Sequence, residues 1–299
     1  MKSRRTTSIS MKIRPWIEAM RLRTLPVSTA GVLVACAYAL ARDCFRPEVA
    51  ALCLVFAILA QITSNFANEY YDWANGSDRP GREGFRRGVT EGDISPKAMR
   101  RATFATLATA CAVGCCLIPF GGWILVPIGI AIAVFALAYS AGPYPLSRHG
   151  LGDVAVLAFF GIVPVTMTYY LQAGTVDSFV IAGSVGIGLL GVNVLIVNNY
   201  RDVDDDRAAG KRTTVVIFGR RAAAVAYLIF GLAGAVLTMG IWGLRNVFII
   251  APIIYLALHY STWRRIVASS GAALNPLLGA TARNMLIYAA LLIIIGIIC

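Results

Sequence analysis

The chain alternates between long apolar runs and shorter polar segments that carry most of its charged residues. Each apolar run is long enough to cross most or all of the roughly 30 Å hydrocarbon core of a bilayer as a helix, at about 1.5 Å per residue. Pro119 and Gly174 interrupt what would otherwise be longer runs. The pattern predicts about nine membrane-spanning helices, over residues 25–41, 49–67, 102–118, 123–139, 154–171, 179–197, 222–241, 247–260 and 286–298.

The composition supports a membrane protein rather than a soluble one. Hydrophobic residues make up 58% of the 299 residues and charged residues only 14%, which leaves too little polar surface to coat a water-soluble particle. The net charge of +12 is spread in short blocks between apolar runs, so it indicates contact with a lipid bilayer and not with nucleic acid. We therefore expect an all-α, polytopic membrane protein with one transmembrane domain over residues 1–299.

The distribution of basic residues predicts the orientation in the membrane. All but three of the 27 Lys and Arg residues lie on one side if the predicted spans are followed in order, and cytoplasmic loops are the ones enriched in these residues. The prediction is a chain in the cytoplasmic (inner) membrane, with its N-terminus inside the cell and its C-terminus outside. The cytoplasmic side would then hold a basic N-terminal segment and two long loops, at residues 1–23, 68–101 and 198–221.

The two long loops begin with the same arrangement of polar residues. Asn68 and Asp72 directly follow one predicted span, and Asn198 and Asp202 directly follow another, with the same spacing of four residues. This repetition indicates an internal duplication. On a helix, residues four and eight positions apart share one face, so Asp206 would point with Asn198 and Asp202 into one cavity.

In the first motif the further aspartate, Asp78, lies six residues after Asp72, which suits a helix that unwinds at Gly76. Carboxylates that converge at a membrane interface repel one another and resist ionisation, unless a cation lies between them. Magnesium takes oxygen ligands and usually pairs one or two carboxylates with substrate phosphates. The two motifs therefore predict Mg2+ ions that bind a diphosphate, with candidate ligands Asn68, Asp72, Asp78, Asn198, Asp202 and Asp206.

Basic side chains near the motifs could neutralise the rest of the phosphate charge. They include Arg82 and Arg87 in the first loop and Arg201 in the second. The alternative is that charged loop residues simply face water and pair with one another. We adopt it for residues such as Asp204, whereas the repeated spacing beside two spans favours a functional role for the motif aspartates.

Further features surround the two motifs. They are Gly76-Ser-Asp78 at the end of the first motif, the run from Asn198-Asn-Tyr-Arg-Asp202 to Asp206-Arg-Ala-Ala-Gly-Lys211, and Gly142-Pro-Tyr-Pro145 followed by Gly150-Leu-Gly152-Asp153.

With these features the chain resembles the UbiA superfamily of intramembrane aromatic prenyltransferases, and most closely its 1,4-dihydroxy-2-naphthoate polyprenyltransferase branch. The resemblance covers nearly the whole chain. It implies about nine helices around a central cavity that is capped by the cytoplasmic loops. It also implies Mg2+-dependent transfer of a polyprenyl group from polyprenyl diphosphate to 1,4-dihydroxy-2-naphthoate, with loss of carbon dioxide and diphosphate, in menaquinone biosynthesis.

The resemblance also suggests roles for individual residues. Catalytic roles fall on Asp72, Asp202 and Asp206, and substrate contacts on Asn68 and Asn198. Independently of the resemblance, the charge and position of the basic residues predict a catalytic role for Lys211 and substrate contacts for Arg23, Arg82, Arg87 and Arg201. Tyr139 could shelter an allylic cation with its ring, or anchor the chain at the membrane interface. Asp153, at the start of a predicted span, could orient a substrate or cap a helix.

Three positions depart from the family pattern. Phe85 stands where a proline often follows the glycine, Leu22 replaces a proline near the N-terminus, and Ile217 replaces an arginine after the second motif. None of the three is a predicted metal ligand.

Two other functions fit parts of the sequence. A prenyltransferase of the same superfamily could act on a different aromatic acceptor, such as 4-hydroxybenzoate. A secondary transporter would also have many spans, internal repeats and carboxylates near the membrane. Transporters normally place such charges at the bilayer midplane, whereas here the acidic residues fall at span ends and in loops, which favours the enzyme.

Overall fold

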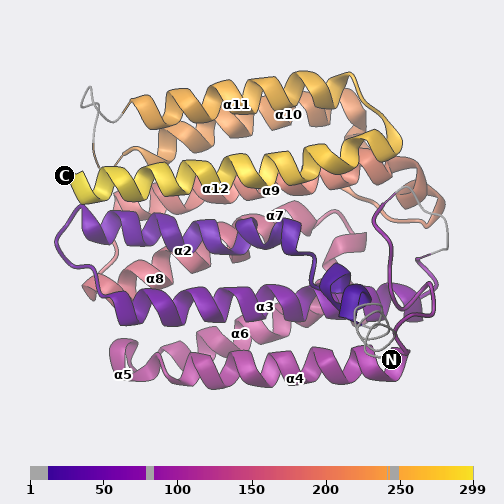
Figure 1. Cartoon of the computed structure of the whole chain (residues 1–299), viewed down its shortest axis with the longest axis horizontal. Helices are drawn as coiled ribbons and strands as arrows, with labels where there is room; N and C mark the ends of the chain where they lie inside the picture. The colour runs from indigo at the N-terminus through magenta and orange to yellow at the C-terminus, as the bar shows by residue number, and fades with distance from the viewer. Residues whose placement is uncertain (1–12, 79–83, 241, 243–248, 299) are drawn as a thin grey trace, which may run out of the picture.

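The computed structural model describes residues 13–78, 84–240, 242 and 249–298, and every regular element within them is helical. The helices lie side by side in one bundle (Figure 1). This confirms the predicted all-α class. The α-helices are α2 (Leu25–Leu40), α3 (Pro47–Ala74), α4 (Pro96–Cys115), α5 (Ile118–Gly121), α6 (Leu125–Ala138), α7 (Gly152–Val156), α8 (Val163–Ala173), α9 (Ser178–Ala208), α10 (Thr214–Thr238), α11 (Ile250–Val267) and α12 (Asn275–Ile298).

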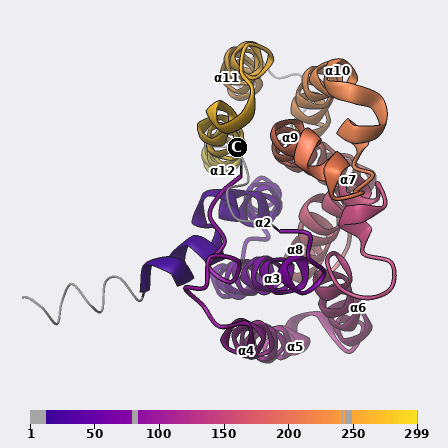
Figure 2. The same cartoon turned by 90° about the vertical axis from the view of Figure 1, so that its right-hand side faces the viewer.

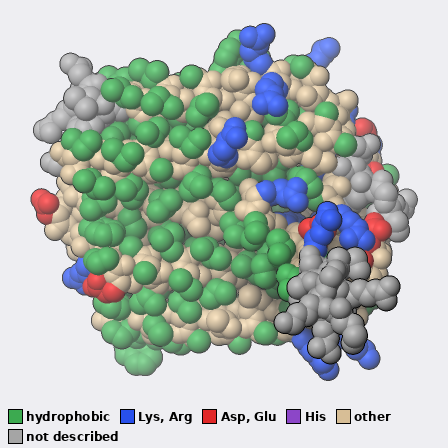
Figure 3. Space-filling view, in the orientation of Figure 1, with side chains coloured by type: hydrophobic (Ala, Val, Ile, Leu, Met, Phe, Trp, Pro, Cys, Tyr) green, Lys and Arg blue, Asp and Glu red, His purple; other side chains and the backbone are tan. Residues whose placement is uncertain are grey.

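The described helices identify the chain as a multi-pass membrane protein. Hydrophobic side chains cover much of the face in Figure 3, and basic ones lie mainly on its right-hand half. Each predicted apolar run overlaps a helix, but the count of nine spans stays a prediction, because α4, α6 and α11 do not reach the length and apolarity that a span requires. Six described helical segments are both long enough and apolar enough to cross a membrane: Ile13–Leu40, Pro47–Ala74, Gly152–Ala173, Ser178–Ala208, Thr214–Thr238 and Gly271–Ile298.

Helix α9 forms the centre of the bundle and carries the second motif at its C-terminal end. It packs against α2, α8, α10 and α12, and most of its apolar part is buried. Seen end-on in Figure 2, α9 and α12 lie beneath α10 and α11, while α3, α4 and α6 form the opposite part of the bundle. Helices α3 and α9 run in the same direction and end on the same side (Figure 1). The fold thereby brings both motifs to one end of the bundle.

Glycines allow α9 to approach the preceding span very closely. A β-carbon placed on Gly161 would lie 2.3 Å from Cα of Gly188 and 2.6 Å from the carbonyl oxygen of Ser184. Only glycine fits at such a distance, and small residues of this kind are typical where helices pack backbone to backbone in membranes. This contact fixes the position of the span that follows Asp153.

The same span contains a wide turn that faces the interior. Residues Leu157–Ile162 form a π-helical segment directly before α8. Pro164, near the start of α8, has no N–H to donate to the carbonyl of Phe160, four residues earlier. Wide turns of this type often lie at functional sites, and Phe160 lines both of the cavities described below.

The basic N-terminal segment packs on α3. Residues 13–20 are helical, Trp16 meets Phe66 of α3 edge to face at 5.8 Å between ring centroids, and the Asn65 side-chain amide donates to the carbonyl of Met20 at 2.9 Å. Arg21 then adopts a left-handed conformation, with φ of 53°, which turns the chain into α2. The turn brings Arg21 and Arg23 to the end of the bundle that holds the motifs.

The Gly161 contact predicts a position that tolerates no side chain. Gly161→Ala should lower the free energy of unfolding by about 1–3 kcal/mol, because the new β-carbon would force α9 and the π turn apart. The measurement is the Tm of the purified protein in detergent. Gly279→Ala is the matched control, since a β-carbon there meets no atom within 4 Å. Equal Tm values for the two variants would contradict the close backbone contact.

Candidate active site

A polar cavity of about 200 Å3 lies at the end of the bundle where α3 and α9 finish. Of the predicted site residues, Arg82 lies outside the described part of the chain, and Asp78 is not among the residues that line the cavity. The structure brings the others together around it: Arg23, Asn68, Asp72, Arg87, Tyr139, Asp153, Asn198, Arg201, Asp202, Asp206 and Lys211.

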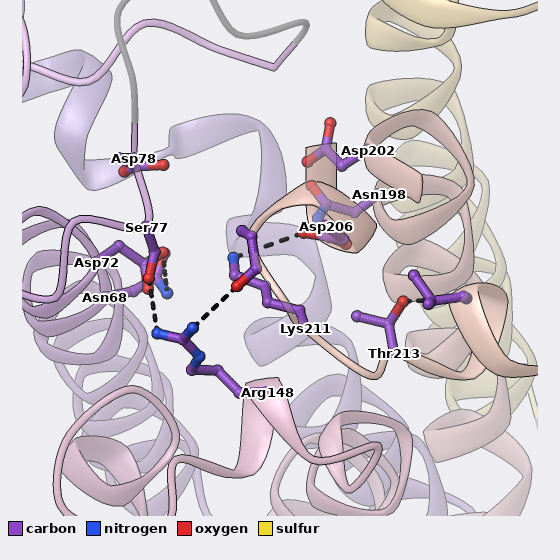
Figure 4. Close-up of polar contacts among 12 residues, drawn as sticks. Asn68, Asp72, Ser77, Asp78, Arg148, Asn198, Asp202, Asp206, Lys211 and Thr213 are labelled. Atoms are coloured by element: carbon purple, nitrogen blue, oxygen red, sulfur yellow. Dashed lines mark hydrogen bonds and ion pairs between the residues drawn. The ribbon is translucent and has the colours of Figure 1, made fainter. Parts of the chain in front are cut away.

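The first motif lies on the last turns of α3. The helix continues beyond the predicted end of the span to Ala74, so Asn68 and Asp72 are one turn apart, and the Asn68 amide donates to Asp72 Oδ2 at 3.1 Å. Gly76 then takes a left-handed φ of 65°. The backbone N–H groups of Ser77 and Asp78 both donate to the carbonyl of Asp72, at 2.8 and 3.3 Å. The helix therefore unwinds at Gly76, as the spacing predicted. Figure 4 shows Ser77 and Asp78 beyond the end of the helix that carries Asn68 and Asp72.

Arg87 joins the three polar residues of the first motif. Its Nη1 donates to Asn68 Oδ1 at 3.1 Å, its Nη2 lies 3.9 Å from Asp72 Oδ2, and its Nε lies 3.4 Å from Asp78 Oδ2. The side chains of Asp72 and Asp78 are only 5% and 1% exposed. Arg87 thus places one positive charge against two buried carboxylates and offsets part of the cost of burying them.

The second motif lies on one unbroken helix. Helix α9 runs to Ala208, so Asn198, Asp202 and Asp206 share one face, as the spacing predicted. Arg201 forms a two-pronged ion pair with Asp202, at 2.6 and 2.7 Å, and also donates to Asn198 Oδ1 at 2.9 Å. Its remaining nitrogen donates to Asn275 Oδ1 on α12, at 2.9 Å. The two motifs therefore match in chemistry: each has an asparagine, an aspartate four residues later, and an arginine bound to both.

Lys211 reaches the second motif through a turn and not by continuation of the helix. Gly210 has a left-handed φ of 70°, and the Lys211 N–H donates to the carbonyl of Asp206 at 2.8 Å. The Lys211 ammonium then lies 3.6 Å from Asp206 Oδ1 (Figure 4). Lys211 adds a compact positive charge to the side of the cavity that α9 forms.

The oxygen atoms of the two motifs suit Mg2+ better than a metal held by protein alone. Within the described residues, no group of three His, Cys, Asp or Glu side chains could hold a metal ion by itself. Magnesium typically takes one or two carboxylates and completes its shell with water and substrate phosphate. Asn68 with Asp72, and Asn198 with Asp202 and Asp206, all line the cavity and could provide such partial shells.

Arg148 connects the two motifs, and the sequence interpretation missed it. Its Nη1 donates to Ser77 Oγ at 2.8 Å and its Nη2 donates to the carbonyl of Ala209 at 3.0 Å (Figure 4). Its own carbonyl accepts from the N–H of Arg212 at 2.9 Å. In the sequence it counts only as a loop charge. The signal that was available is that Arg148 is the one basic residue between the fourth and fifth predicted spans, on the same side as both motifs.

Asp153 lies at the start of α7 and lines the cavity. The helix begins at Gly152 and its N-cap is Leu151, so Asp153 does not cap it. Asp153 Oδ1 is buried and has no hydrogen-bond partner among the described residues. A buried oxygen in this state is costly unless a ligand or water donates to it, which favours the substrate-orienting alternative.

An apolar cavity of about 290 Å3 continues from the polar one. Gln61, Ser64, Tyr139 and Phe160 line both, so Tyr139 lies where the two cavities meet. The apolar cavity runs between α3, α4, α6 and α8, and some of its lining side chains, such as Ile130 (60% exposed), are also at the surface. The pair of cavities can hold a molecule with a highly charged head and a long apolar tail.

Comparisons with known proteins agree with this geometry. The chain is 39% identical over 216 residues to the 1,4-dihydroxy-2-naphthoate octaprenyltransferase of Escherichia coli (strain K12), covering 70% of each chain. It is 36% identical over 247 residues to the protein of the same name from Haemophilus influenzae, covering 76% of this chain and 80% of the relative.

Solved structures share the fold. A UbiA homolog from Aeropyrum pernix K1 matches 90% of this chain and 97% of its own with a TM-score of 0.70 at 15% identity. A UbiA homolog from Archaeoglobus fulgidus, bound to DMAPP and Mg2+, matches 92% of this chain and 99% of its own with a TM-score of 0.62 at 18% identity. Residues 29–288 also match the profile of the UbiA prenyltransferase family, and the chain belongs to that family.

Proposed function

We propose that the chain transfers a polyprenyl group from polyprenyl diphosphate to 1,4-dihydroxy-2-naphthoate, and releases diphosphate and carbon dioxide to give demethylmenaquinol in menaquinone biosynthesis. The observation that carries the proposal is the continuity of a polar cavity, lined by two Asn/Asp motifs, with an apolar one. Relatives that are 32–39% identical and named 1,4-dihydroxy-2-naphthoate octaprenyltransferase support the choice of acceptor.

The diphosphate would lie between the two motifs. Asn68 and Asp72 on one side, and Asn198, Asp202 and Asp206 on the other, would hold Mg2+, with Asp78 behind Arg87. When bound, Mg2+ stabilises the negative charge that grows on the departing diphosphate. Arg87, Arg201 and Lys211 provide donors that can turn from the carboxylates to phosphate oxygens. Support comes from the relative from Archaeoglobus fulgidus, whose solved structure holds DMAPP and Mg2+.

The prenyl tail would occupy the apolar cavity, which places the reacting carbon near Tyr139 and Phe160. There the bond between the allylic carbon and the diphosphate oxygen breaks, and its electron pair leaves with the diphosphate. The aromatic faces favour the resulting cation, and the apolar walls keep water away from it. The electron-rich ring carbon that bears the carboxylate attacks the cation. The electrons of the bond to the carboxylate then restore the aromatic ring as carbon dioxide leaves.

The proposal includes a placement in the membrane. The polar cavity and both motifs would face the cytoplasm from the inner membrane, with the N-terminus inside the cell and the C-terminus outside. The single domain would span residues 1–299. This follows from the excess of Lys and Arg on the motif side. It gives two water-soluble compounds, the acceptor and the released diphosphate, direct access to the cytoplasm.

The proposed metal ligands predict a severe loss of turnover when the charge of a motif aspartate is removed. Asp72→Asn, Asp202→Asn and Asp206→Asn should each lower turnover by roughly 10²-fold or more, because electrostatic stabilisation of a leaving group is worth several kcal/mol. The assay follows product formation from prenyl diphosphate and Mg2+ in membranes. Asp204→Asn is the matched control, since its side chain lies on the same helix but is 71% exposed. Near-normal turnover in all three variants would contradict the ligand assignment.

Arg148 is predicted to hold the ends of the two motifs in fixed positions relative to each other. Arg148→Ala removes two hydrogen bonds from a charged donor, and should raise the KM for prenyl diphosphate and for Mg2+ by roughly tenfold or more. The control is Arg207→Ala, which removes an exposed charge near the same end of α9. If Arg148→Ala left the KM for prenyl diphosphate and the KM for Mg2+ unchanged, the hydrogen bonds to Ser77 and Ala209 would have no role in binding.

The acceptor proposal predicts the fate of the carboxyl group. With 1,4-dihydroxy-2-naphthoate labelled in that group, release of labelled carbon dioxide should match product formation one for one. It should also require both Mg2+ and the prenyl diphosphate. Efficient prenylation of 4-hydroxybenzoate with its carboxylate retained, and no reaction with the naphthoate, would overturn the choice of acceptor while leaving the family membership intact.

A further inference from the structure

Arg23 differs from the other cations that line the polar cavity. Arg87 and Arg201 are bound to motif aspartates, and Lys211 lies beside Asp206. Arg86 pairs with Asp93 at 2.6 Å, and Arg21 donates to Asn68 Oδ1. Arg23 forms no hydrogen bond or ion pair with any described residue. Glu18 acts on it only at longer range and is itself bound to Arg14 at 2.8 Å. The cavity therefore contains one guanidinium whose donors are not committed within the described chain.

The ring of Phe85 holds this guanidinium in place. Arg23 Cζ lies 3.4 Å from the centroid of the Phe85 ring, and Arg201 Cζ lies 5.1 Å from the same centroid. In such a stack the guanidinium uses its face, and the N–H groups along its edge stay available. These edge groups form the planar fork that matches a carboxylate. The phenylalanine that departs from the family pattern thus positions a guanidinium whose edge can bind an anion.

We propose that Arg23, positioned by Phe85, binds the carboxylate of the aromatic acceptor. The motif cations lie where the metal-bound diphosphate would be, whereas Arg23 belongs to the turn Leu22–Thr24, between the N-terminal helix and α2. Two anions could therefore be held in one cavity, the diphosphate by the motif cations and the carboxylate by Arg23, with the Phe85 ring in contact with both Arg23 and Arg201. This inference rests on the proposed function and adds to it the contact that selects a carboxylated ring.

The test compares two inhibitors that differ by one carboxylate, 1-hydroxy-2-naphthoate and 1-naphthol, in the prenylation assay with the membrane-embedded full chain. The ratio of their inhibition constants reports the preference for the carboxylate. In Arg23→Gln this preference should fall roughly tenfold or more, the usual effect of removing a charged hydrogen bond. Arg23→Lys should retain part of it. The KM for prenyl diphosphate should change little, because the motif cations remain.

The role of Phe85 has its own pair of variants. Phe85→Leu should reduce the carboxylate preference by releasing the guanidinium, and Phe85→Tyr should preserve it by keeping an aromatic face. Arg86→Gln is the matched comparison: it removes another arginine from the cavity lining and, whatever it does to turnover, should leave the ratio unaltered. Retained KM for prenyl diphosphate shows that each variant is folded.

The possible results distinguish a failure of the Arg23 inference from a failure of the proposed function on which it rests. A wild-type chain that does not prenylate 1,4-dihydroxy-2-naphthoate would overturn the proposed function itself. A wild-type chain that does so, with an unchanged carboxylate preference in Arg23→Gln, would overturn only the role of Arg23. Equal preferences in Phe85→Leu and Phe85→Tyr would overturn only the positioning role of Phe85.

Discussion

The structure depends on compensating the negative charge of the four motif carboxylates, which lie almost fully buried at one end of a membrane bundle. Asp72, Asp78, Asp202 and Asp206 are each at most 8% exposed. Buried charges of one sign are very costly unless they are paired. Arg87 forms ion pairs with the carboxylates of the first motif, and Arg201 and Lys211 form ion pairs with those of the second. The same balance explains the chemistry, since a cavity that can hold several carboxylates and several cations can exchange partners when a metal-bound diphosphate enters.

The bundle is built to keep this balance in one place. Close backbone contact between Gly161 and Gly188 fixes the fifth predicted span against α9. Arg148, from the loop before that span, then joins the ends of both motifs. Asn275 on α12 takes the last nitrogen of Arg201. Helices that are distant in the sequence thus hold the charged groups in fixed positions relative to one another, as efficient electrostatic stabilisation requires.

Much of the site could be predicted because it is local. The spacing of Asn198, Asp202 and Asp206 places them on one helical face wherever the helix runs, and Gly76 marks the unwinding before Asp78. The helices continue past the predicted spans, since α3 and α9 run to Ala74 and Ala208, beyond the apolar residues. Hydropathy reports only the part of a helix that faces lipid or core, and these last turns face the cavity. The roles of Arg148 and Phe85 depend on contacts between distant segments, which no spacing in one sequence reveals.

The central claim is that the two motifs together hold metal ions around one diphosphate. Anomalous diffraction from crystals grown with Mn2+ in place of Mg2+, and with an unreactive prenyl diphosphate analogue, tests it most directly. We expect ions at both motifs, one contacting Asp72 and one contacting Asp202 or Asp206, with metal–oxygen distances of about 2 Å and the diphosphate between them. Ions bound at only one motif, or a diphosphate held by arginines and lysine with no ion nearby, would contradict the account.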